Sequence, residues 1–124
     1  MADPGLEVLK PRAGAAVVVL HGEHDLATKE AFRAAFTSLL DANDLVIADL
    51  SETLYIDSSV LGELVRADRT AHESGKRFRL QFGTEPIVKR VFEISGLLDL
   101  LDWYPTRDEA LDEPRPEKTP DRLL

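Results

Sequence analysis

The sequence contains no cysteine, which excludes a disulfide framework, a thiol nucleophile and a cysteine-based metal site. It also has no long hydrophobic run. The longest run, residues 15–20, is far too short to span a bilayer, and the first residues lack the basic-then-apolar form of a signal peptide. The absence of cysteine fits a reducing compartment, and together with the lack of a signal peptide and of a membrane span it leads us to expect a cytoplasmic protein.

Positive charge is scarce as well, because 15 basic residues stand against 23 acidic residues and the net charge is −8. Nucleic-acid binding requires clustered Lys and Arg, so this composition argues against a nucleic-acid partner. It argues equally against an anionic membrane surface. A protein partner with a basic patch is the more natural expectation.

The chain has 124 residues, of which 44% are hydrophobic and 31% are charged, so it suits one domain with a core and a soluble surface. Five segments have the pattern of strands. Residues 6–9 alternate weakly before a turn at residues 11–14, and residues 15–20 form a Val-rich buried run that we pair with them as a hairpin. Further strands are expected at residues 45–50 and 78–82, with a short last strand at Trp103 and Tyr104.

Helical spacing separates these strands. Thr28 is expected to cap a helix whose buried face includes Phe32, Ala35, Phe36, Leu39 and Leu40. A second helix is expected over residues 58–74, and a third is expected to be capped by Thr84 and to include Phe92. Thr106, with Glu109 three residues later, indicates a capping box for a short final helix.

Alternating strands and helices imply right-handed parallel crossovers. The predicted fold class is therefore α/β: a single domain with a mostly parallel mixed sheet, an N-terminal hairpin strand and helices packed against the sheet. The domain is expected to cover residues 1–112. Residues 113–124 form a Pro-rich acidic tail without periodicity, which we expect to be disordered.

The functional surface of such sheets lies at the carboxyl ends of the parallel strands. Residues 21–25 and 51–59 leave strands at that edge, and the second segment places Asp57, Ser58 and Ser59 at a helix start. A helix N-terminus carries unpaired N–H groups and the positive end of the dipole, so it tolerates a phosphoryl group. The pattern predicts a phosphorylatable switch on a small binding domain.

Several short motifs resemble the STAS domain (sulfate transporter and anti-sigma factor antagonist) over roughly residues 6–112. The most specific motif is Asp49-Leu50-Ser51 followed by Ile56-Asp57-Ser58-Ser59 and Leu61-Gly62. Weaker likenesses lie in residues 22–28, 89–97 and 104–111. Val60 departs from the family pattern, which usually carries Gly there, and it adds bulk beside the site.

This resemblance implies a bacterial anti-sigma factor antagonist, which is a binding protein and not an enzyme, needs no cofactor and takes part in regulating transcription by partner switching. The family's anti-sigma factor doubles as a serine kinase and phosphorylates the serine after the motif aspartate, here Ser58. The unphosphorylated form binds the anti-sigma factor and frees the sigma factor, and a phosphatase resets the switch. The expected partner-binding residues are Asp25, Asp57, Ser59 and Val60. We expect phosphate beside Asp57 and Asp25 to act by local repulsion and bulk.

Other interpretations stay open. Ser58 and Ser59 also suit ordinary helix-start residues, and Asp57 suits a plain helix cap. A STAS subunit of a larger assembly, either a stress-signalling scaffold or a lipid-transport complex, is the alternative function.

Enzymatic and metal-binding alternatives are weaker. The sequence around Ser58 lacks the Gly-x-Ser-x-Gly elbow of a serine hydrolase. An aspartate-phosphorylated receiver would use Asp49, which we instead expect to be buried and bonded to loop amides. His21 and His24 lack metal-ligand spacing, so we expect solvated loop histidines and no metal.

Overall fold

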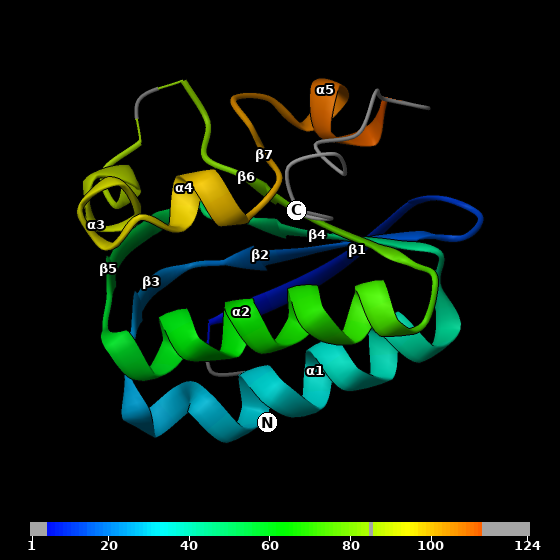
Figure 1. Cartoon of the computed structure of the whole chain (residues 1–124), viewed down its shortest axis with the longest axis horizontal. Helices are drawn as coiled ribbons and strands as arrows, with labels where there is room; N and C mark the ends of the chain where they lie inside the picture. The colour runs from blue at the N-terminus through cyan, green and yellow to red at the C-terminus, as the bar shows by residue number, and fades with distance from the viewer. Residues whose placement is uncertain (1–4, 85, 113–124) are drawn as a thin grey trace.

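The computed structural model describes residues 5–84 and 86–112 and contains a five-stranded sheet with helices on both faces (Figure 1). The sheet order is β1-β2-β4-β6-β7. β1 (Leu6–Arg12) lies antiparallel to β2 (Ala15–Leu20), and the other neighbours are parallel: β4 (Leu45–Asp49), β6 (Arg77–Gln81) and β7 (Trp103–Tyr104). The predicted α/β class, with its mostly parallel sheet and N-terminal hairpin strand, is confirmed.

The side chains of the central strands alternate between two buried faces, as the pleat of a strand requires. Val46 and Ala48 of β4 belong to the larger core, whereas Leu45 and Ile47 belong to the smaller core on the opposite face. Because both faces are covered, the central strands appear in the sequence as continuous apolar runs and not as alternating ones. Every residue of β2 and β4 is buried.

Two long helices cover the larger core. α1 (Lys29–Ala42) contributes Phe32, Phe36 and Leu40, and α2 (Ser58–Glu73) contributes five residues, among them Leu64. The two helices lie side by side and run in the same direction, so their first residues are at the same end of the molecule (Figure 1). That end is also where β2, β4 and β6 finish.

Short elements complete the fold. α3 (Lys89–Ser95) and α4 (Leu97–Leu100) follow β6 and contribute Phe92 to the larger core, while α5 (Arg107–Leu111) lies on the opposite face of the sheet (Figure 1). Thr106 caps α5 as predicted, since its Oγ1 accepts a hydrogen bond from the Glu109 amide at 3.1 Å, which is one of the two bonds of a capping box. None of the described helices is long and apolar enough to cross a membrane.

The structure departs from the expected elements at three places. Residues 22–28 are not a plain loop, because β3 (Gly22–His24) pairs with β5 (Thr53–Ile56) in a separate two-stranded sheet, and η1 (Leu26–Thr28) follows. Thr28 precedes α1, but its hydroxyl donates to the Asp25 carbonyl oxygen at 3.1 Å and does not cap the helix. Thr84 does not begin α3, which starts only at Lys89, beyond Pro86; a proline disfavours helix in the residue before it.

The predicted tail, residues 113–124, lies outside the described residues.

Candidate functional site

The start of α2 is organised by the carboxylate of Asp57. Its Oδ1 accepts hydrogen bonds from the amides of Ser59 at 3.0 Å and Val60 at 3.2 Å, so Asp57 is the N-cap of the helix. The hydroxyl of Ser59 also donates to this oxygen at 2.6 Å. These hydrogen bonds, led by that of the Ser59 side chain, lower the pKa of Asp57, and the carboxylate therefore stays ionised at neutral pH.

The two serines differ sharply in what their hydroxyls contact. Ser59 is half-buried and its hydroxyl is occupied by Asp57, as the helix geometry predicts. Ser58 is exposed, and its hydroxyl forms no hydrogen bond with any residue in the described part of the chain. Ser58 is therefore the hydroxyl at this helix start that is free to enter another protein's active site.

Asp25 lies beside Asp57 because β3 and β5 are paired. The Asp57 amide donates to the His24 carbonyl oxygen at 3.1 Å, which brings the ends of the two strands together. Asp25 is exposed and caps η1, where its Oδ1 accepts from the Ala27 amide at 2.9 Å. Each of these two carboxylates is fixed by a capping role, and Asp57 directly precedes Ser58 in the sequence.

Val60 differs from the other expected partner-binding residues, because its side chain is fully buried in the larger core. The first turn of a helix must direct some side chains at the sheet, and Val60 is on that side. Its side chain cannot touch a partner or add bulk at the surface. Val60 can therefore affect binding only by changing the position of the first turn of α2, which carries Ser58.

Apolar side chains surround the helix start. Leu26 is 67% exposed, and Leu54 and Tyr55 of β5 are 58% and 51% exposed. Singly exposed apolar residues are common, and it is a patch of them that marks an interaction site; these three lie within three residues of Asp25 or Asp57 in the sequence. Sequence reasoning missed them because the β3–β5 pair that holds them outside the main core was not predicted.

His24 is buried, which corrects the expectation of a solvated loop histidine. Its Nε2 is 3.0 Å from the His21 carbonyl oxygen and its Nδ1 is 3.3 Å from Thr28 Oγ1, so it ties β3 to the start of α1. Burial lowers the pKa of His24. Among the described residues no group of three or more His, Cys, Asp or Glu could hold a metal ion.

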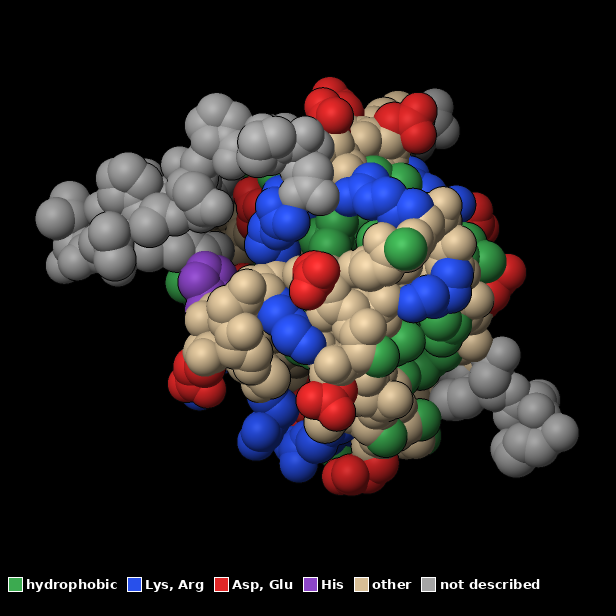
Figure 2. All heavy atoms as spheres, turned by 90° about the vertical axis from the view of Figure 1, so that its right-hand side faces the viewer, with side chains coloured by type: hydrophobic (Ala, Val, Ile, Leu, Met, Phe, Trp, Pro, Cys, Tyr) green, Lys and Arg blue, Asp and Glu red, His purple; other side chains and the backbone are tan. Residues whose placement is uncertain are grey.

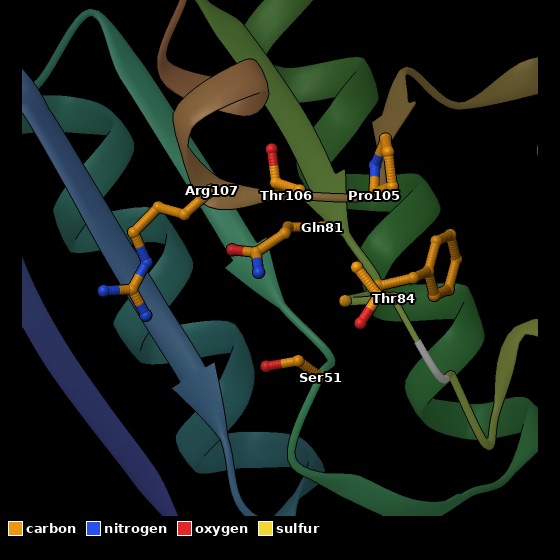
Figure 3. Close-up of a pocket in the computed structure, with 8 residues that line it drawn as sticks. Ser51, Gln81, Thr84, Pro105, Thr106 and Arg107 are labelled. Carbon is orange, nitrogen blue, oxygen red and sulfur yellow. The ribbon is translucent and has the colours of Figure 1, made fainter.

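Asp49 is buried at the end of β4, as predicted, and it accepts hydrogen bonds from the Ser51 amide at 2.9 Å and the Ser51 hydroxyl at 2.6 Å. Its other oxygen pairs with Arg107 Nη2 at 2.9 Å, a contact 58 residues away in sequence that nothing in the local pattern could reveal. Ser51 and Arg107 border a hollow of about 470 Å³, which Gln81 also lines (Figure 3).

The fold and the helix start define a small α/β domain with an exposed serine directly after a capping carboxylate, and with exposed apolar side chains nearby in the sequence. The family model described as "Mlab, STAS domain" matches residues 9–102. The chain therefore belongs to the STAS domain family.

Solved structures of similar fold support this assignment. The anti-sigma factor antagonist SpoIIAA in its unphosphorylated form is 26% identical with a TM-score of 0.72, over 86% of this chain and 93% of that one. An anti-sigma factor antagonist from Mycobacterium paratuberculosis is 26% identical with a TM-score of 0.70, over 90% and 96%. The STAS domain of a SulP transporter from Vibrio cholerae, at 23% identity and a TM-score of 0.61 over 83% and 81%, shares the fold.

Proposed function

We propose that this protein is an anti-sigma factor antagonist whose binding is switched off by phosphorylation of Ser58. In its unphosphorylated form it binds an anti-sigma factor that is also a serine kinase, and a sigma factor is released. A phosphatase restores the binding form. The protein acts in the cytoplasm as a binding module and not as an enzyme.

One observation carries the proposal: of the two serines at the start of α2, only Ser58 presents an exposed hydroxyl without a hydrogen-bond partner in the described part of the chain. The likeness to solved anti-sigma factor antagonists, one of them described as phosphorylated, supports the same assignment. The apolar rim of Leu26, Leu54 and Tyr55 supplies contact area for the partner, and Asp25 and Asp57 supply charge.

Phosphate on Ser58 adds about −1.5 to −2 charges and considerable bulk at the centre of this surface. The start of a helix accommodates an anion without unfolding, because its amides and dipole favour negative charge. The switch therefore acts at the interface, through charge and size, and the fold stays the same.

The assignment is tested by incubating the protein with its cognate kinase and ATP and mapping the product by mass spectrometry. We expect one phosphoryl group, on Ser58. Ser59→Ala, which keeps the free hydroxyl, remains a substrate, and Ser58→Ala does not. A phosphate on Ser59, or continued labelling of Ser58→Ala, would contradict the proposal.

The match to a family model described as "Mlab, STAS domain" favours a second candidate, a STAS subunit of a larger assembly. The two candidates differ in size in solution. Light scattering of the native complex gives a monomer or small complex for the antagonist and a much larger particle for the subunit.

A further inference from the structure

A hollow between α1 and α2 runs along the surface from Ser58. Its volume is about 460 Å³, and Ser58, Ser59 and Gly62 of α2 border it. Four cationic side chains and two carboxylates also line it: Lys29, Arg33, Arg66, Arg69, Glu63 and Glu73. In a chain of net charge −8, this hollow is a local concentration of positive charge.

The geometry of the helices brings a cation to Ser58. Lys29 is the first residue of α1 and Ser58 the first residue of α2, and the two helices start at the same end of the molecule (Figure 1). Arg66 lies two turns further along α2, about 12 Å by helix rise, and helical side chains lean towards the N-terminus. Both cations therefore border the space that a group on Ser58 would enter.

The charges in the hollow are only partly balanced. Arg33 holds the buried Glu63 through two hydrogen bonds of 3.0 and 2.7 Å, so that pair is complete. Arg66 Nε is 3.7 Å from Glu63, a weaker contact, and Lys29 and Arg69 form no ion pair with a carboxylate of the described residues. Lys29 is close enough to Glu63 to help lower the pKa of its carboxyl group, although Arg33 and Arg66 have larger effects.

Gly62 lines the hollow together with Ser58 and Arg66 and adds no side chain to it. It is exposed inside α2, and a Cβ added there would meet nothing within 4 Å, so packing does not require glycine. Glycine costs roughly 0.5–1 kcal/mol against alanine inside a helix. Since packing does not require glycine at position 62, we attribute its presence to the space that it leaves in the hollow.

We propose that this hollow is the receiving site for the phosphoryl group of Ser58, with Lys29 and Arg66 as its ligands. The inference rests on the proposed phosphorylation of Ser58 and specifies where the phosphate goes. The phosphate dianion forms ion pairs with these two cations and is also stabilised by the start of α2. Nearby carboxylates repel it, and these are Asp25, Glu30, Asp57, Glu63 and Glu73. Arg33 stays with Glu63. The modified side chain is thereby held against its own domain.

The test is a ³¹P NMR titration of protein carrying phosphoserine at position 58, introduced during translation so that no kinase is needed. Free phosphoserine changes from monoanion to dianion at about pH 6. Cations stabilise the dianion, so we expect the wild-type phosphate to titrate about half a unit or more below the phosphate of Lys29→Gln/Arg66→Gln. Both replaced side chains reach the surface, so the variant keeps its fold.

Arg90→Gln is the matched control, since Arg90 is an exposed cation on α3 without an ion pair in the described residues. It should titrate like the wild type. Equal titration of wild type and Lys29→Gln/Arg66→Gln would overturn the receiving site. Failure of the receiving site and failure of the proposed function give different results. If the phosphate titrates alike in the wild type and in Lys29→Gln/Arg66→Gln but phosphorylation still abolishes partner binding, only the receiving site is refuted. If the two titrations differ but phosphorylation does not affect binding, only the proposed switch is refuted.

Discussion

At the scale of single residues, Asp57 combines three tasks in one carboxylate. It caps α2, it occupies the hydroxyl of Ser59, and it leaves the hydroxyl of Ser58 free. The proposed preference of a kinase for Ser58 over Ser59 therefore has a local structural basis in the geometry of this helix start.

Replacing the cap should have a measurable effect on stability. Asp57→Ala removes the hydrogen bonds to the amides of Ser59 and Val60, and we expect a loss of about 1 kcal/mol in the free energy of unfolding. Urea denaturation measures this loss. Asp57→Asn is the control, because asparagine caps as well as aspartate; an equal loss in both variants would show that the charge and not the cap matters.

His24 should make stability depend on pH. Because burial lowers its pKa in the folded state, the unfolded chain binds a proton more readily, and stability falls as pH drops below about 6.5. Unfolding by urea at pH 7 and pH 5.5 measures the change. His24→Gln should lack that part of the decrease, and an undiminished pH dependence in this variant would contradict the assignment.

At the scale of elements, the helices hold the site through aromatic contacts with the sheet. Phe36 of α1 meets Phe78 of β6 edge-on with ring centroids 5.4 Å apart, and Phe32 packs on Phe36 within α1 at 4.5 Å. Phe92 of α3 meets Phe82, the residue after β6, edge-on at 5.0 Å. Both Phe32 and Phe92 are fully buried.

Truncating these aromatic residues should be costly. Phe32→Ala and Phe92→Ala each remove a buried ring and leave a cavity, and we expect losses of about 3–5 kcal/mol in the free energy of unfolding. Thermal or urea denaturation measures both. Ile94→Ala, on an exposed side chain of α3, should be nearly neutral; near-neutral behaviour of Phe32→Ala or Phe92→Ala would contradict the observed packing.

The helices and strands also differ in how well they could be predicted from the sequence. The strands of the main sheet and the two long helices follow from apolar runs and helical spacing, and Asp57 and Ser58 could be placed at a helix start for the same reason. The β3–β5 pair could not be predicted, because residues 22–24 are polar and β5 is four residues long. The pairing of Asp49 with Arg107 and the cations around Ser58 depend on tertiary contacts that leave no local pattern.

At the scale of the whole molecule, charge is unevenly distributed. On the face shown in Figure 2, at the end of the molecule away from Ser58, Lys and Arg side chains alternate with Asp and Glu side chains. Ser58 borders the α1–α2 hollow, which four cationic side chains line, and it directly follows Asp57 in the sequence. A phosphoryl group on Ser58 would therefore add its charge where side chains of both signs lie close together.

The central claim is that phosphorylation of Ser58 controls binding. The partner is first isolated from the native cell by pull-down with the Ser58→Ala variant. Isothermal titration calorimetry then measures its affinity for the unphosphorylated protein and for protein carrying phosphoserine at position 58. We predict at least a roughly tenfold weaker Kd for the phosphorylated form, about 1.4 kcal/mol, with Ser58→Ala equal to the unphosphorylated protein. Equal affinity of the phosphorylated and unphosphorylated forms would contradict the account.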